Sequence, residues 1–462
     1  MVSLQIGIPL DGDGTETLMT DTGSTATAAN QANSNRWIII GVLSVGMIVA
    51  YVSRAALSVP LAMPAFIKAF HLSLTDRGIL NSAFFWTYAV LQIPAGFVVD
   101  RYGIKFPYFL GFAIWCLASA CTALTHSMPQ LILVQVLLGA GQSIVVPASY
   151  RWIRHHFGEK ERGLAIALYM TGTKIGPAIG TPLAAFLISA YDWRFMFVLI
   201  GFGGMIWLVP WLLLVKNDDR EIEWAARKKD GGKPIPFARI LASPVTLGTI
   251  IGSFCYMYFV YFCMTWMPAY FMERRHLSLG KMGLFVFFSF GGMALVATLA
   301  GWSADLLIGR GYNPVNVRKC FTIVGFSVAC TELIGARATS LETALLFAVI
   351  SLSGLGLATA NYWALTQTLM PAAAIGRISG VQNCACSLAG IVAPILTGWL
   401  LQKTGNYETP MMALLCVLIA GVLSYVFLVK EKYALTPGDG GSETERMTMP
   451  LRMQSTPGAA RS

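Results

Sequence analysis

Charged residues are scarce in this sequence of 462 residues. Asp, Glu, Lys and Arg make up 12% of it and hydrophobic residues 55%, whereas soluble domains carry about 25% charged residues. This balance excludes an intrinsically disordered chain, a collagen and a soluble cytosolic enzyme. Apolar runs of about 20 residues, each long enough to cross a bilayer, recur along most of the chain. The composition therefore predicts an all-α membrane protein with many spans.

Motifs that carry enzyme chemistry are also missing. No CxxC pair accompanies the nine cysteines, so a zinc or redox site has no support. No GxxxxGK[ST] run appears, and the apolar runs hold no cluster of nucleophiles or metal ligands. We therefore expect no enzyme, metal or cofactor. The polar residues 1–36 lack the apolar core of a signal peptide, and the net charge of +10 is typical of membrane-protein loops rather than of nucleic-acid binding.

Twelve apolar segments are predicted to be transmembrane helices, because each is too long for a barrel strand and lacks period-2 alternation. They divide into two bundles of six helices, 37–215 and 243–430, joined by a polar linker at 216–242. We expect disordered tails at 1–36 and 431–462, both cytoplasmic because most of the 33 Lys and Arg residues then lie on the cytoplasmic side. The predicted segments are 37–60, 80–100, 106–125, 130–152, 163–190, 194–215, 243–272, 280–304, 319–337, 341–369, 376–401 and 409–430.

A repeated motif supports the division into two halves. Gly96, Asp100 and Arg101 occur in GFVVDRYGIK at the end of the second segment, and GWSAD, with Asp305, ends the eighth segment shortly before Arg310. Duplicated six-helix halves are typical of transporters that bind substrate between the halves. We interpret the charged residues as a conformational latch outside the substrate site, with Gly96 allowing a close helix approach.

Two basic residues lie in the middle of predicted spans, Arg54 in the first and Lys174 in the fifth. An ionisable group there costs about 2.5–3.5 kcal/mol on insertion scales, so each is a functional candidate. A guanidinium can grip a carboxylate through two hydrogen bonds, and Tyr51 lies on the same helix face as Arg54. Lys174 would supply a second positive charge, unless it is a structural ammonium. A small organic anion is the predicted substrate.

The loop motif and the twelve segments resemble the major facilitator superfamily (MFS), and shorter motifs in both halves resemble its anion:cation symporters. These motifs are YVSR at 51–54, YAVLQIPAG at 88–96, GPAIGTP at 176–182, NYW at 361–363 and GVQN at 380–383. The resemblance implies the MFS fold and alternating-access transport of a sugar acid of the hexuronate, aldonate or galactonate type. It also implies that Arg54 is the anion anchor and that Tyr88, Trp363 and Asn383 contact the polar ligand.

The chain departs from that family at the residues that couple transport to protons. The family typically has Asp in the first span and Glu in the fourth, with Arg seven residues before the Glu. The matching positions here are Ser53, Gln142 and Gln135, and neither serine nor glutamine takes up a proton near neutral pH. Both glutamines join the candidate substrate-binding residues. Uniport or exchange, coupling through another group such as Lys174, and a different substrate class stay open.

These observations predict a monomeric carrier in the plasma (inner) membrane. Its expected partners are the lipid bilayer, a small organic anion and, if a coupling group exists, protons. A non-transporting nutrient sensor on the same fold and a carrier of dicarboxylates or aromatic acids are the alternatives. Uptake into vesicles separates a sensor from a carrier, because a sensor binds its ligand without accumulating it.

Overall fold

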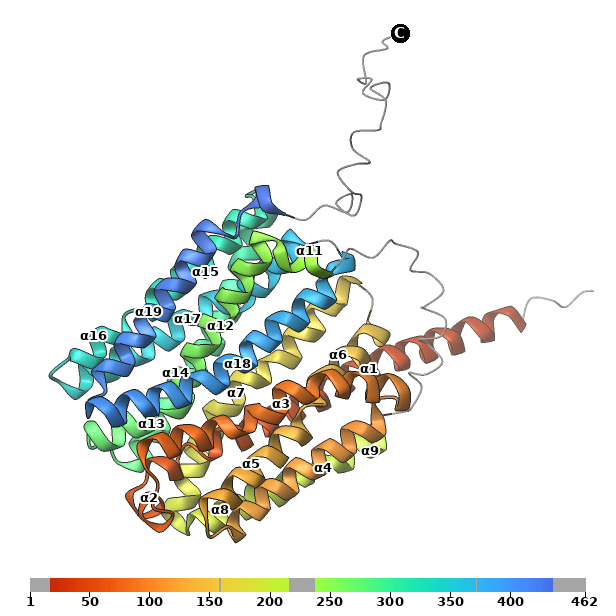
Figure 1. Ribbon diagram of the computed structural model, residues 1–462. Helices are drawn as coiled ribbons and strands as arrows, with labels where there is room; N and C mark the ends of the chain where they lie inside the picture. The colour runs from red at the N-terminus through yellow and green to blue at the C-terminus, as the bar shows by residue number, and fades with distance from the viewer. Residues whose placement is uncertain (1–16, 158, 216–236, 371, 435–462) are drawn as a thin grey trace, which may run out of the picture.

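The computed structural model describes residues 17–157, 159–215, 237–370 and 372–434, and these residues form helices without any strand (Figure 1). The first half contains α1 (Thr17–Ala56), η1 (Pro60–Ala62), α2 (Pro64–Ala69), α3 (Leu74–Tyr102), α4 (Lys105–Cys121), η2 (Thr122–Leu124), α5 (Met128–Gln142), α6 (Val145–His156), α7 (Glu159–Ala190), α8 (Trp193–Met205) and α9 (Leu208–Leu214). The second half contains α11 (Phe237–Ala242), α12 (Pro244–Thr265), α13 (Met267–Ala269), η3 (Tyr270–Arg274), α14 (Leu279–Gly309), α15 (Pro314–Ala329), α16 (Glu332–Arg337), α17 (Leu341–Leu369), α18 (Ala372–Thr404), α19 (Glu408–Phe427) and η4 (Glu431–Tyr433).

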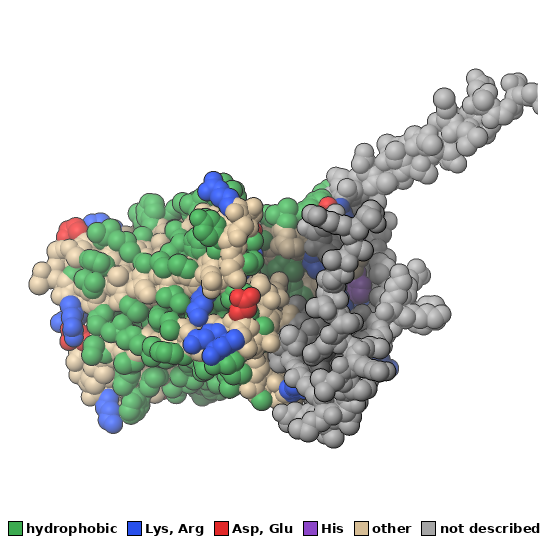
Figure 2. Space-filling model, turned by 90° about the horizontal axis from the view of Figure 1, so that it is seen from above, with side chains coloured by type: hydrophobic (Ala, Val, Ile, Leu, Met, Phe, Trp, Pro, Cys, Tyr) green, Lys and Arg blue, Asp and Glu red, His purple; other side chains and the backbone are tan. Residues whose placement is uncertain are grey.

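The helices are those of an integral membrane protein. In the described ranges, 11 stretches are long and apolar enough to span a bilayer. The one predicted segment that is not among these 11 stretches is the fifth, 163–190. It forms α7, whose sequence TGTKIGPAIGTP makes it less apolar than the others. Figure 2 shows hydrophobic side chains over much of the visible face, and several of them, such as Phe97 (71% exposed) and Leu213 (78% exposed), lie on the surface.

The helix boundaries depart from the prediction at the tails and the linker. Helix α1 begins at Thr17 rather than near residue 37, so the segment 17–36 is helical and its prediction as a disordered tail is wrong. The end of the predicted linker forms α11, and the start of the predicted C-terminal tail forms η4. Residues 1–16, 216–236 and 435–462 lie outside the described ranges.

Side-chain caps fix where key helices begin. The Ser73 hydroxyl accepts from the Asp76 backbone N–H (3.1 Å), and the Asp76 carboxylate accepts from the Ser73 backbone N–H (2.9 Å). This capping box satisfies N–H groups that have no partner within the helix. Asn313 caps α15 in a similar way, accepting from Val315 N–H at 2.9 Å, with Pro314 in the first turn. The cap on α3 sets the position of its first turn, which faces the other half.

The two halves meet along two antiparallel helix pairs, α3 with α18 and α7 with α14. We name the ends of the bundle after the helices that lie there, the α2 end and the α11 end (Figure 1). A Cβ on Gly283 of α14 would lie 2.9 Å from Cα of Pro182 of α7, and a Cβ on Gly398 of α18 would lie 2.5 Å from the carbonyl oxygen of Leu74. Both close approaches lie toward the α2 end.

The contact between α3 and α18 stops before the α11 end. Asn383 of α18 donates a hydrogen bond to Gln92 of α3. One turn further along each helix, a Cβ on Gly96 or on Gly380 would meet nothing within 4 Å. In this conformation Gly96 therefore makes no close helix approach, and its expected role in the latch stays a prediction. The halves are sealed at the α2 end and apart at the α11 end.

Candidate functional site

Arg54 lies among three aromatic rings. Its guanidinium carbon is 4.5 Å from the ring centre of Tyr51, 4.4 Å from that of Phe84 and 4.5 Å from that of Tyr88. Tyr51 precedes Arg54 by one helical turn on α1, and the other two rings are one turn apart on α3. Cation–π attraction stabilises a guanidinium in such a desolvated position. The structure therefore brings together the predicted residues Arg54, Tyr51 and Tyr88.

Gln142 fixes the orientation of the guanidinium. Arg54 Nε donates to Gln142 Oε1 at 2.7 Å, and Gln142 Nε2 donates to the Ala50 carbonyl at 3.1 Å. The glutamine, which is fully buried, therefore joins α5 to α1 through the arginine. Arg54 Nη1 is buried without a hydrogen-bond partner in the described part of the chain. The guanidinium thus keeps donor capacity on the edge that Gln142 does not use.

A small cavity adjoins Arg54. It is lined by polar and apolar side chains of both halves, namely Arg54, Leu57, Asn81, Phe84, Phe85, Gln135, Met264 and Thr265. In this conformation the cavity has room for roughly one water molecule. The predicted residue Gln135 (5% exposed) therefore lines the same cavity as Arg54.

Lys174 lies at the boundary between the halves. It is 7% exposed, and its ammonium nitrogen is 5.6 Å from the ring centre of Tyr256 on α12. Tyr256 packs on Tyr362 (4.8 Å between centroids), which packs on Trp363 (5.3 Å). Among the described residues, no carboxylate forms an ion pair with Arg54 or with Lys174. Two buried cations without counter-charges are costly, and an anionic ligand would neutralise them.

The remaining predicted residues have other partners. Trp363 belongs to the aromatic cluster near Lys174, and Asn383 bonds Gln92 across the two halves. Ser53 donates to the Val49 carbonyl of its own helix at 3.0 Å. Among the described residues, the guanidinium of Arg54 forms its cation–π contacts and its hydrogen bond with other side chains.

The residues of the predicted latch lie at the ends of α3 and α14. Asp305 pairs with Arg318 of α15 (3.0 Å), whereas Arg310 is exposed at the end of α14. The first turns of α15 bring Arg318 back to the carboxylate of Asp305. The interpretation of these charges as a conformational latch stays a prediction. The guanidinium carbon of Arg101 lies 5.7 Å from the ring centre of Tyr102. The side chain of Asp100 lies outside the described structure.

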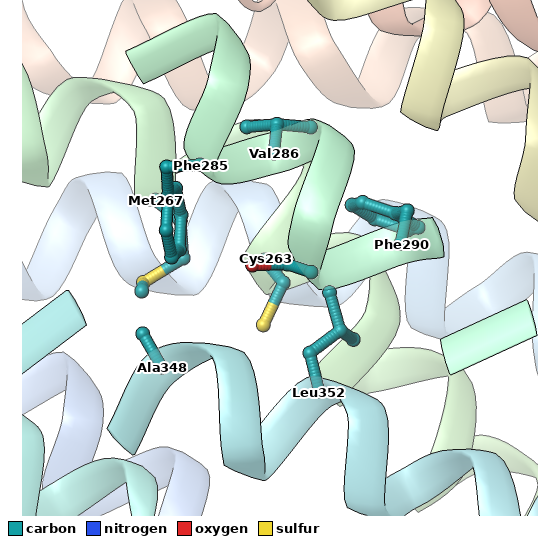
Figure 3. A pocket seen from close by; sticks show the side chains of 8 residues that line it. Cys263, Met267, Phe285, Val286, Phe290, Ala348 and Leu352 are labelled. Atoms are coloured by element: carbon teal, nitrogen blue, oxygen red, sulfur yellow. The ribbon is translucent and has the colours of Figure 1, made fainter. Parts of the chain in front are cut away.

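The C-terminal half holds a second small cavity (Figure 3). Its lining is almost wholly apolar, with Met267 and Phe285 on one side of the view and Phe290 and Leu352 on the other. It offers no charged group to bind an anion. The candidate site is therefore the Arg54 cavity together with the neighbouring Lys174 region.

Sequence reasoning missed several residues of this site. Phe84, Asn81 and Thr265 line the Arg54 cavity, and Gln92 bridges to Asn383. Phe84 lies one turn before Tyr88, so a common helix face with that residue was the available signal. No signal in the sequence pointed to Thr265, since it belongs to the other half and only tertiary packing places it beside the Arg54 cavity.

Comparison with known proteins identifies the fold and the family. Residues 43–394 match the family model described as the Major Facilitator Superfamily. The chain belongs to this superfamily. Its fold is similar to that of a bacterial homolog of the human lysosomal transporter Spinster in an inward-facing and occupied conformation, with a TM-score of 0.71, 17% identity and coverage of 87% of this chain and 99% of that one.

Two relatives of this MFS protein are named for sugar acids. It is 28% identical over 399 residues to the probable L-galactonate transporter of Escherichia coli (strain K12), covering 83% of this chain and 87% of the relative. It is 29% identical over 370 residues to the hexuronate transporter of Bacillus subtilis (strain 168), covering 78% and 87%.

Proposed function

We propose that this MFS protein carries a small organic anion of the sugar-acid type across the plasma membrane by alternating access. The observation that carries the proposal is the buried Arg54, which is oriented by Gln142 and has no carboxylate partner among the described residues. A planar guanidinium with free donors suits a carboxylate. The relatives named for L-galactonate and hexuronate support a hydroxylated carboxylate as the substrate.

The remaining polar groups fit a hydroxylated anion. Gln135, Asn81 and Thr265 line the cavity beside Arg54, and amides and hydroxyls both donate to and accept from sugar hydroxyls. Lys174 would bind a second anionic group or raise the local positive potential. We further propose that the protein is a monomer. Its α11 end and both termini are placed in the cytoplasm, because the Lys and Arg residues of the connecting segments concentrate on that side.

Counterflow tests whether the protein is a carrier. Proteoliposomes loaded with unlabelled galactonate are expected to accumulate labelled galactonate or glucuronate transiently, because a carrier exchanges its substrate across the membrane. A non-transporting sensor would bind the acid, detected as a rise in thermal unfolding temperature, without accumulation. Binding without counterflow therefore contradicts the proposal, and protein-free liposomes are the control.

Exchange is also expected to be nearly independent of a pH gradient. Ser53 and Gln142 stand where coupling carboxylates would be, and neither can carry a proton, so an inward proton gradient should change the initial rate by less than about twofold. The rate is measured first with equal internal and external pH. It is then measured with the external pH unchanged and the internal pH altered to impose the gradient. A strict requirement for inward protons would contradict this reading and would direct attention to other ionisable groups.

A further inference from the structure

An ion pair joins the two halves at the α2 end. Arg77 lies in the first turn of α3, and Glu273 lies in η3, which follows α12 and α13 in the other half. Arg77 Nη1 is 2.8 Å from Glu273 Oε1, and the side chains are 4% and 28% exposed. Most exposed ion pairs contribute little to stability, but breaking a pair that is removed from water is strongly unfavourable.

Neighbouring groups hold both members of the pair in place. The Tyr407 hydroxyl donates to Glu273 Oε2 at 2.8 Å. The guanidinium of Arg77 lies 5.1 Å from the ring centre of Trp266, whose indole N–H donates to the Pro394 carbonyl at 3.1 Å. The partners come from three separate segments of the C-terminal half. The side chain of Arg77, from the first half, therefore lies between a carboxylate and an aromatic ring that the second half holds in place.

Further bonds seal the same end. The Thr75 backbone N–H, in the first turn of α3, donates to Gln402 Oε1 at 3.0 Å across the halves. Gly78 lies so close to α18 that a Cβ would collide with the Pro394 carbonyl oxygen. At the α11 end, by contrast, Gly96 and Gly380 face open space. The ion pair therefore belongs to the closed end of a bundle whose other end is separated.

We propose that Arg77 and Glu273 form the gate that closes the substrate pathway at the α2 end, with Tyr407 and Trp266 as its supports. The proposal rests on the alternating access of the proposed function. The two charges lie on halves that must separate when this end opens, so the pair exists in one conformation and is lost in the other. It stabilises the state closed at the α2 end, and its removal shifts the population toward the state open at that end.

Thr265 provides a reporter on the substrate side of this gate. It lines the Arg54 cavity, is 5% exposed, and directly precedes the gate residue Trp266. In a Thr265→Cys protein, a small membrane-impermeant methanethiosulfonate reagent applied at the α2 side should react only when the gate opens. The chain has nine native cysteines, which also react with the reagent. The labelling rate of each gate variant is therefore also measured without Thr265→Cys, and this background rate is subtracted.

Glu273→Gln is expected to raise this labelling rate about tenfold, because a desolvated charge is left without its partner in the closed state. Arg77→Gln should act in the same direction. The double exchange Arg77→Glu/Glu273→Arg should bring the rate back toward that of the parent. Thermal unfolding shows which variants are folded, and if Glu273→Gln is not, the double exchange and Arg77→Gln carry the test.

Glu408→Gln is the matched control. Glu408 pairs with Arg337 at 3.4 Å on the α2 side, but both residues belong to the C-terminal half and both are 57% exposed. Its loss should leave labelling unchanged. Equal rates for Glu273→Gln and the parent, or an equal increase in Glu408→Gln, would overturn the gate. Labelling needs no substrate, so a failure of anion counterflow with an intact labelling shift would contradict the proposed function and not the gate.

Discussion

Arg54→Ala is expected to abolish uptake of organic anions in a protein that still folds. The guanidinium is oriented by Gln142 and enclosed by three rings, and no described carboxylate neutralises it. If it binds the substrate carboxylate, its removal costs roughly 2 kcal/mol or more, and uptake should fall by at least about 30-fold. The initial rate of counterflow in proteoliposomes measures the effect.

Two further variants separate charge from geometry. Arg54→Lys keeps the positive charge but cannot present the planar pair of donors, so it should transport weakly with a raised KM. Arg337→Ala removes an exposed arginine remote from the cavity and should transport normally. Arg54→Ala protein that binds and transports the anion as the parent does would show that the anion is held elsewhere.

The helical architecture was predictable because lipid imposes it. Twelve long segments required helices, and each is helical in the structure; even α7, with its glycines, prolines and Lys174, was recognised by its length. The start of α1 was not, since a polar segment rich in Thr, Asn and Ala carries no periodic signal of where its helix begins. The partner of Asp305 was also missed, because the turn between α14 and α15 decides that Arg318 reaches it.

The candidate site was predictable where local periodicity or a rare charge revealed it. Arg54 stood out as a charge inside an apolar run, and Tyr51 shares its face by simple helix spacing. Glu273 was indistinguishable from an ordinary loop charge, since its role depends on Arg77, far away in the sequence. A contact between the halves depends on how two folded bundles dock, and the pattern within either bundle does not contain that information.

Gly78→Ala is expected to impair transport by blocking closure at the α2 end. A Cβ at this position would collide with the Pro394 carbonyl oxygen, which is backbone and cannot turn aside. Overpacking of this kind costs roughly 1–3 kcal/mol, and here the cost falls only on the state in which α3 and α18 touch. Each half remains able to fold, so the protein should be purified intact but populate the state open at the α2 end, with uptake reduced about tenfold.

The same Cβ placed on Gly280 provides the comparison. Gly280 lies in the first turn of α14 toward the same end, and a Cβ there would meet nothing within 4 Å, so Gly280→Ala should transport normally. Labelling at Thr265→Cys from the α2 side should rise in Gly78→Ala and stay constant in Gly280→Ala. Full transport by folded Gly78→Ala protein would show that α3 and α18 need not meet at Pro394 during the cycle. Alternating access would then have to close this end through contacts other than those at Gly78.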